Sequence, residues 1–231
     1  PGSCKKDLRK NVSGDAGTDL LDGAYALETP EDNRAYYQRF ASSYDQDFAM
    51  GLGYIYPEAV VDAFLELTDL PKGLVCDIGC GTGLVAGHLK AKCPDIEIDG
   101  VDISADMLAV AANKSLYQNL YEVDLTGDIA ALPKGYAAII SAGTFTHGHL
   151  GPEPLHQLIR HCQVGGVFCV GVNQQHYQKY DFAGSLRSLA ENNVITSPDL
   201  LETAIYEQNA DKHSGDLALI CRFRVVGRSP V

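Results

Sequence analysis

The chain has 231 residues, a length that suits a single α/β domain. Its 18 basic and 30 acidic residues give a net charge of −12, so the surface is poor in the Lys and Arg side chains that neutralise a phosphate backbone. No apolar run approaches the roughly 20 residues that span a bilayer. We therefore expect neither nucleic acid nor a membrane as partner. A small molecule or a protein is favoured, a neutral or cationic substrate fits best, and the chain is expected to be a monomer or a homodimer.

Residues 1–30 are rich in Gly, Asp, Lys and Ser with little periodicity, which indicates a flexible N-terminal arm. From Pro30 the pattern is helical, because aromatic residues recur at spacings of three and four: Tyr36, Tyr37, Phe40, Tyr44 and Phe48. This stripe predicts a helix whose aromatic face either covers a site as a lid or packs on the sheet. The glycines of 51–53 end the pattern, and a second helix is expected to begin near Pro57.

Beyond this region, short apolar runs alternate with helical stretches. Strands are predicted at 74–78, 96–103, 120–125, 137–142, 167–172 and 217–226. Helices are predicted at 84–92, after the N-cap Ser104, at 155–162, near 186–192 and near 198–207. This alternation indicates an α/β fold with a mainly parallel, Rossmann-like sheet covered by helices on both faces. No break in composition divides the chain, so residues 31–231 are expected to form one domain.

Seven cysteines are spread along the chain, and Cys76, Cys169 and Cys221 lie in apolar runs. Free cysteine packs as a small apolar residue, so we expect reduced thiols in a cytoplasmic protein. There is no CxxC pair, and the His147-x-His149 pair lacks a third ligand. No metal site is predicted.

A glycine-rich turn, Asp77-Ile78-Gly79-Cys80-Gly81-Thr82-Gly83, follows the first predicted strand and precedes a helix. In open α/β sheets, ligands bind at such strand ends. Two more acids end the next strands. Asp102, about 20 residues beyond the turn, can hydrogen-bond both hydroxyls of a ribose, and Asp124 can lie near an adenine edge. Any one of these acids alone is equally well explained as a strand-end cap, but together with the glycines they indicate a nucleotide cofactor.

The spacing of the glycines separates two cofactors. A nicotinamide dinucleotide needs Gly-x-Gly-x-x-Gly, with the helix N-terminus facing its pyrophosphate. Here the pattern is Gly79-x-Gly81-x-Gly83. A carboxylate at Asp77 would repel a pyrophosphate, whereas it suits the ammonium and sulfonium of S-adenosylmethionine. The residues favour the latter.

The segment 75–83 resembles motif I of the class I S-adenosylmethionine-dependent methyltransferases. The segment 101–108 resembles their second motif, and Asp124-Leu125 their third. The Tyr44-Asp45 pair and the segment 142–145 are similar to the branch of the methyltransferase-like 27 (Williams-Beuren region) proteins. The resemblance implies a doubly wound, mostly parallel seven-stranded sheet with an antiparallel C-terminal strand, N-terminal helices as a lid, and S-adenosyl-L-methionine as cofactor.

Carried over by position, the resemblance assigns a set of residues to the cofactor: Asp77, Gly79, Cys80, Gly81, Asp102, Ile103, Met107, Asp124, Leu125, Ala142, Gly143 and, in the lid, Tyr37. The turn and Asp77 would line the methionine portion, and Asp102 would hold the ribose. The side chains on either side of Asp102 and Asp124 would surround the adenine. The main-chain carbonyls of Ala142 and Gly143 would accept from the ammonium.

Three residues are candidates for catalysis. His147 and His149 follow the fourth strand of the alternation, where a neutral histidine could deprotonate a hydroxyl or thiol, or could simply be exposed or capping. Tyr44 would belong to the lid, where ring faces favour a sulfonium cation. After the fifth strand, Asn173, His176 and Tyr177 are expected to contact substrate.

The predicted function is in-line methyl transfer to an oxygen, sulfur or nitrogen of a small-molecule acceptor. The Asn/Asp-Pro-Pro-Tyr/Phe motif of amino-group methylases of bases and glutamine is absent after the fourth strand. Three alternatives stay open: a non-catalytic S-adenosylmethionine-binding module, a protein side-chain methyltransferase, and an NAD-dependent oxidoreductase, which the glycine spacing disfavours.

Overall fold

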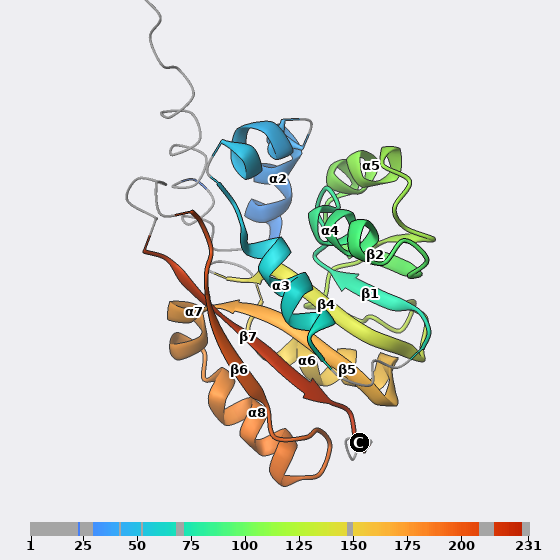
Figure 1. The fold of residues 1–231 in the computed structure, drawn as a ribbon, viewed down its shortest axis with the longest axis vertical. Helices are drawn as coiled ribbons and strands as arrows, with labels where there is room; N and C mark the ends of the chain where they lie inside the picture. The colour runs from blue at the N-terminus through green and yellow to red at the C-terminus, as the bar shows by residue number, and fades with distance from the viewer. Residues whose placement is uncertain are drawn as a thin grey trace, which may run out of the picture.

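The computed structural model describes residues 23, 30–41, 43–51, 53–67, 72–146, 150–207 and 215–227. Within this part of the chain seven strands form one sheet in the order β3-β2-β1-β4-β5-β7-β6 (Figure 1). The strands are β1 (Val75–Ile78), β2 (Ile98–Asp102), β3 (Leu120–Glu122), β4 (Tyr136–Phe145), β5 (Cys162–Asn173), β6 (Asp199–Ala204) and β7 (Leu217–Arg224). Strands β1 to β5 pair in parallel, and β7 is antiparallel to both β5 and β6. The expected Rossmann-like sheet with an antiparallel C-terminal strand is confirmed.

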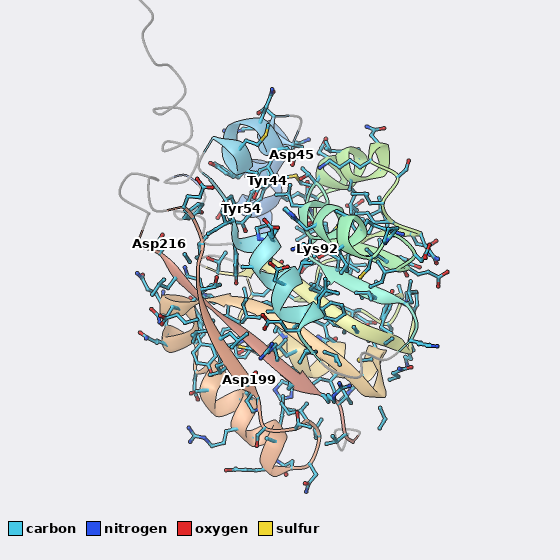
Figure 2. The ribbon with its side chains drawn as sticks, in the orientation of Figure 1. Tyr44, Asp45, Tyr54, Lys92, Asp199 and Asp216 are labelled. Atoms are coloured by element: carbon cyan, nitrogen blue, oxygen red, sulfur yellow. The ribbon has the colours of Figure 1, made fainter. Side chains whose placement is uncertain are left out.

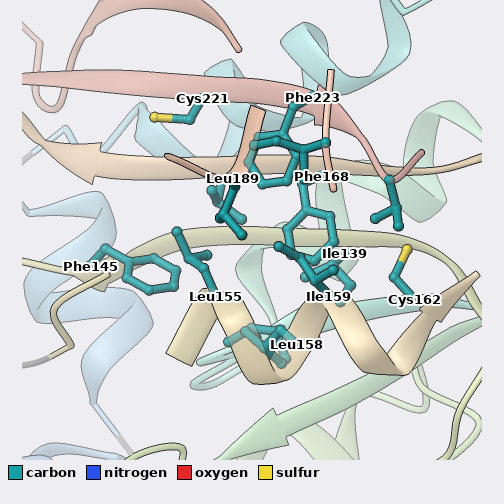
Figure 3. Packing of buried hydrophobic residues seen from close by; sticks show 14 of the residues in the cluster. Ile139, Phe145, Leu155, Leu158, Ile159, Cys162, Phe168, Leu189, Cys221 and Phe223 are labelled. Carbon is teal, nitrogen blue, oxygen red and sulfur yellow. The ribbon is translucent and has the colours of Figure 1, made fainter. Parts of the chain in front are cut away.

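Helices cover both faces of this sheet. They are α2 (Pro30–Phe40), the π-helix η1 (Asp45–Met50), α3 (Tyr56–Leu65), α4 (Leu84–Lys92), α5 (Ala105–Asn113), α6 (Glu153–His161), α7 (Gln174–Lys179) and α8 (Phe182–Glu191). On one face α6 and α8 bury their apolar sides against β4, β5 and β7, where Phe168 and Phe223 stack with ring centroids 4.8 Å apart (Figure 3). On the other face α3 and α4 pack against β1, β4 and β5. Nearly all the side chains in both layers are buried aliphatic or aromatic groups, whose removal from water is the main stabilising contribution.

Local sequence signals place several of these elements correctly. The helix predicted at 84–92 is α4, and Ser104 caps α5 by accepting a hydrogen bond at Oγ from the Met107 amide at 3.3 Å. The side chains of Ser141 and Thr144 both donate to the Ile78 carbonyl, at 2.7 and 2.9 Å. These two hydrogen bonds join the end of β1 to β4 at the point where the glycine turn begins.

Two sequence predictions are corrected. The aromatic stripe does not form one helix, because α2 ends at Phe40 and the chain resumes as η1 after Tyr44. The helix expected near 198–207 is wrong, since residues 199–204 form the edge strand β6. Its apolar spacing imitates a helix, but β7 lies between β5 and β6 and needs a hydrogen-bonding partner on its second edge. The short helix α7 was not predicted.

The arm predicted over 1–30 lies outside the described residues, apart from Gly23 and Pro30. Six cysteines lie in the described part and all six are free thiols, five of them buried. In that part of the chain, no helix combines the length and the apolar character needed to cross a membrane.

Candidate functional site

A pocket opens where the parallel strands end and lies against the N-terminal helical segment. Its wall includes every residue assigned to the cofactor from the sequence except Asp77. Tyr37 of α2 and Tyr44, just before η1, line it from the N-terminal side, and Figure 2 shows Tyr44, Asp45 and Tyr54 together at the α2 end of the molecule. The residues that the sequence assigns to the cofactor thus line one pocket, with the exception of Asp77.

Gly79 and Gly81 have different tasks in the first turn. Both have positive φ, +63° and +52°, a conformation that side chains with a Cβ rarely adopt. A Cβ at Gly79 would collide with the Thr144 side chain, so this glycine lets β4 approach the turn. A Cβ at Gly81 would meet no atom within 4 Å. The main chain of Gly81 is thus not covered by other atoms where it lines the pocket, which fits a cofactor that lies directly against the backbone.

Asp102 is fixed at the end of β2 by two backbone amides. Its Oδ2 accepts from the Gly81 amide at 2.8 Å, and its Oδ1 accepts from the Ser104 amide at 2.9 Å. Burial raises the pKa of this carboxyl, and the amide hydrogen bonds oppose that rise. Each oxygen keeps a second lone pair, so a ribose diol remains an acceptable hydrogen-bond donor.

Asp77 is completely buried and does not line the pocket. The Tyr117 hydroxyl donates to its Oδ2 at 2.7 Å, while its Oδ1 has no hydrogen-bond partner among the described residues. Burial raises the pKa of this carboxyl to about 7. An unsatisfied buried carboxylate oxygen is costly, and a hydrogen-bond donor such as the cofactor ammonium, or a water between them, would relieve it.

Asp124, which also lines the pocket, follows β3. Its Oδ1 accepts from both the amide and the hydroxyl of Thr126, at 2.8 and 2.6 Å. Beside it the wall is apolar, with the buried side chains of Met107 and Leu125. An apolar slot with one acceptor at its rim is suited to an adenine ring with its amino group outward.

Asp45, the first residue of η1, connects the N-terminal segment to the site by a hydrogen bond and an ion pair. Its Oδ1 accepts from the Thr82 hydroxyl of the glycine turn at 2.5 Å, and its Oδ2 forms an ion pair with Lys114 after α5. The Tyr37 and Tyr44 rings meet edge to face with centroids 6.0 Å apart, and burial raises the pKa of both phenols. We call α2, Tyr44 and η1 together the lid.

Two residues that line the pocket could not be assigned to it from the sequence. Tyr54 and Tyr206 are far apart along the chain, but they form an isolated antiparallel bridge, and their ring centroids lie 5.6 Å apart. The bridge is flanked by hydrogen bonds from the Ile55 amide to the Ile205 carbonyl and from the Glu207 amide to the Gly53 carbonyl. Because Tyr206 follows the strand that was predicted as a helix, its place in the wall could not be foreseen.

Of the residues predicted for catalysis or substrate contact, some line the pocket and others do not. Tyr44 lines the pocket, whereas His147 and His149 lie outside the described residues. Asn173 also lines it, and its side chain caps α7 by accepting from the His176 amide at 3.1 Å. His176 and Tyr177 do not line the pocket: the first hydrogen-bonds the Leu150 carbonyl and the second stacks on Phe182.

The strand order, the glycine turn after β1 and the acid that ends β2 define the class I methyltransferase fold. The methyltransferase domain family matches residues 75–166. Residues 75–166 therefore match a methyltransferase domain, within a sheet that has the fold of the class I S-adenosylmethionine-dependent methyltransferases.

Individual relatives agree with this class. The chain is 33% identical over 138 residues to human methyltransferase-like protein 27, covering 58% of this chain and 55% of that protein. It is also 33% identical over 139 residues to ribosomal RNA small subunit methyltransferase C of Ectopseudomonas mendocina, covering 54% and 41%. The chain thus spans about half the length, or less, of these curated relatives. A TehB-like methyltransferase structure from Corynebacterium glutamicum superposes with a TM-score of 0.54 at 20% identity, over 85% of this chain and all of that one.

Proposed function

We propose that the protein transfers a methyl group from S-adenosylmethionine to an oxygen, sulfur or nitrogen of a small-molecule acceptor. One observation carries the proposal: a single pocket joins the bare main chain at Gly81 and the carboxylates of Asp102 and Asp124 to a tyrosine-lined space under the lid. The prediction of one methyltransferase domain over 31–231 is part of this proposal.

The cofactor supplies an electrophilic methyl group on sulfur, so the task of the chain is to position it. Gly81 and Asp102 would hold the ribose and methionine portions, and Asp124 would accept from the adenine amino group. Tyr37 and Tyr44 would cover the sulfonium. Alignment of acceptor and methyl group can lower a barrier by about 7–11 kcal/mol. A hydroxyl or thiol acceptor also needs a base, for which His147 and His149 remain the candidates.

A small acceptor is favoured over RNA, although one relative is a ribosomal RNA methyltransferase. The net charge of −12 opposes a phosphate backbone. The charged side chains among the described residues that line the pocket are Asp102 and Asp124, both acidic. A basic peptide side chain would suit the same charge, so a protein substrate is the second candidate; a binding module without activity is the third.

The test is isothermal titration of the purified protein with S-adenosylhomocysteine, with NADH as the control, followed by methylation assays on small-molecule, peptide and ribosomal RNA acceptors. We expect micromolar binding of the first ligand and none of NADH. If neither binds, or only NADH binds, the proposal is wrong. Tight binding with no product from any acceptor would favour the binding module.

A further inference from the structure

The pocket wall divides into two chemically different halves. Over β1 to β3 lie the glycine turn and the two acids assigned to the cofactor. The other half lies over the ends of β4, β5 and β6, and we call it the acceptor half; its members include Tyr54, Thr146, Leu150, Asn173, Ile205 and Tyr206. None of the described residues that line this half carries a charged side chain.

A backbone bridge and ring contacts position the aromatic wall of the acceptor half. The bridge between Tyr54 and Tyr206 fixes the backbones of both residues, and Tyr54 also meets Tyr56 edge to face with centroids 6.2 Å apart. A Cβ built at Gly143 would lie 2.6 Å from the Tyr54 hydroxyl oxygen, so this hydroxyl lies directly against the main chain of β4. Tyr54 therefore stands where the cofactor half meets the acceptor half.

A carboxylate or phosphate acceptor would be desolvated in this half without a described cation to pair with it, which is unfavourable. A hydroxyl or thiol would have to lose its proton to a base. The titratable side chains that line this half among the described residues are phenols, and the base candidates His147 and His149 lie outside those residues. Burial raises the pKa of Tyr44, which borders this half, well above its usual value. An amine enters as a cation at neutral pH, and aromatic faces stabilise that cation without a carboxylate partner. Its proton can pass to water before the nitrogen lone pair attacks the methyl carbon.

We propose that the acceptor half, formed around Tyr54, Tyr206 and Asn173, binds an amine, which would make the protein an N-methyltransferase of small amines. The inference rests on the proposed function. The bound ammonium first gives one proton to water. The amine nitrogen then donates its lone pair to the methyl carbon, and the N–C bond forms as the C–S bond breaks with its electron pair on sulfur; the methylated amine leaves as an ammonium. S-adenosylhomocysteine and the methylated amine are the products.

The test uses the full chain saturated with S-adenosylhomocysteine, so that only the acceptor half is open. Three probes of similar shape are titrated by calorimetry: 2-phenylethylamine, 2-phenylethanol and 3-phenylpropionate. We expect the amine to bind about tenfold more tightly than the alcohol, the size of a cation–π contact, and the propionate to bind more weakly than both. Equal or tighter binding of the propionate or the alcohol, or no binding of the amine, overturns the inference.

Matched variants separate the aromatic wall from the general attraction of a negative protein for cations. Tyr54→Phe keeps the ring and should keep the preference for the amine, whereas Tyr54→Leu should reduce the amine-to-alcohol affinity ratio to about one. If Tyr54→Leu keeps the full ratio, the ring is not the recognition element and the inference is wrong. The titration with S-adenosylhomocysteine alone comes first: if it binds and the amine preference is absent, the acceptor class fails while the proposed cofactor stands.

Discussion

Asp77 combines complete burial with one carboxylate oxygen that lacks a hydrogen-bond partner in the described part of the chain. Such a group destabilises the fold once it ionises. Its other carboxylate oxygen, Oδ2, accepts a hydrogen bond from the Tyr117 hydroxyl, on the loop after α5. This arrangement is expected where a ligand, and not the protein alone, completes the hydrogen bonding of a site. The cost in stability and the gain in affinity should therefore be separable by mutation.

We predict that Asp77→Asn stabilises the ligand-free protein and weakens cofactor binding. The folded carboxyl has a pKa of about 7, above its ordinary value of 3.8, so the folded state binds more protons than the unfolded state between these pH values. The wild type therefore loses stability as pH rises through that window. The variant lacks this loss. Its advantage in Tm over the wild type should be small near pH 4 and full at pH 8, in thermal melts at a series of pH values. An advantage that does not change with pH would contradict the raised pKa.

Asp102 offers a cleaner test of affinity, because it lines the pocket. Asp102→Asn keeps one oxygen acceptor and the side-chain shape, but removes the charge that strengthens hydrogen bonds to ribose hydroxyls. We expect S-adenosylhomocysteine to bind about 1–3 kcal/mol more weakly by calorimetry. Asp106→Asn is the matched control, since Asp106 is exposed on the neighbouring turn of α5 and is outside the pocket wall. Equal affinity in wild type and Asp102→Asn would remove Asp102 from the ribose site.

At the scale of elements, Asp45 joins the lid to the site through contacts with two other segments. Asp45 connects η1 to the glycine turn through Thr82 and to the end of α5 through Lys114, and α2 packs beside α5 (Figure 1). Tyr44, the neighbour of Asp45, lines the pocket. Removing the contacts of Asp45 should leave the sheet intact and allow the lid to move away from the cofactor more easily.

We therefore expect Lys114→Met to release S-adenosylhomocysteine faster, by about two- to fivefold, the size of a partly exposed ion pair of about 0.5–1 kcal/mol. Because the chain has 12 tyrosines and no tryptophan, stopped-flow tyrosine fluorescence can follow the release. Lys90→Met is the control, since Lys90 contacts only the Pro94 carbonyl among the hydrogen bonds described. High salt should bring the wild type toward the variant, and an unchanged release rate would show that the ion pair does not hold the lid.

The elements that the sequence predicts well are those whose signals are local. The apolar runs, the glycine turn and the Ser104 cap depend on neighbours within a few residues, and they place β1, α4 and α5. The cofactor half follows because its residues stand at the ends of successive strands. The acceptor half does not, since Tyr54 and Tyr206 meet only through a bridge between distant segments. Likewise β6 is a strand because β7 pairs with it, a cause outside its own sequence.

At the scale of the whole molecule, the pocket draws on both packed layers. Its wall takes residues from the turn after β1, from β4 and β5, and from the lid, so both hydrophobic cores must be formed before the site exists. A ligand of this site should bind the folded chain and not the unfolded one. Its binding free energy should then appear in full as stability.

We predict that S-adenosylhomocysteine at 100 times its calorimetric Kd stabilises the protein by about 2.7 kcal/mol. For a chain of this size that corresponds to a rise in Tm of about 5–10 °C, measurable by differential scanning calorimetry. NADH at the same concentration should give no shift, and Asp102→Asn should need a proportionally higher ligand concentration for the same rise. A ligand that binds by titration yet leaves the main transition unmoved would mean that the site forms in a part of the chain that unfolds separately from the two cores.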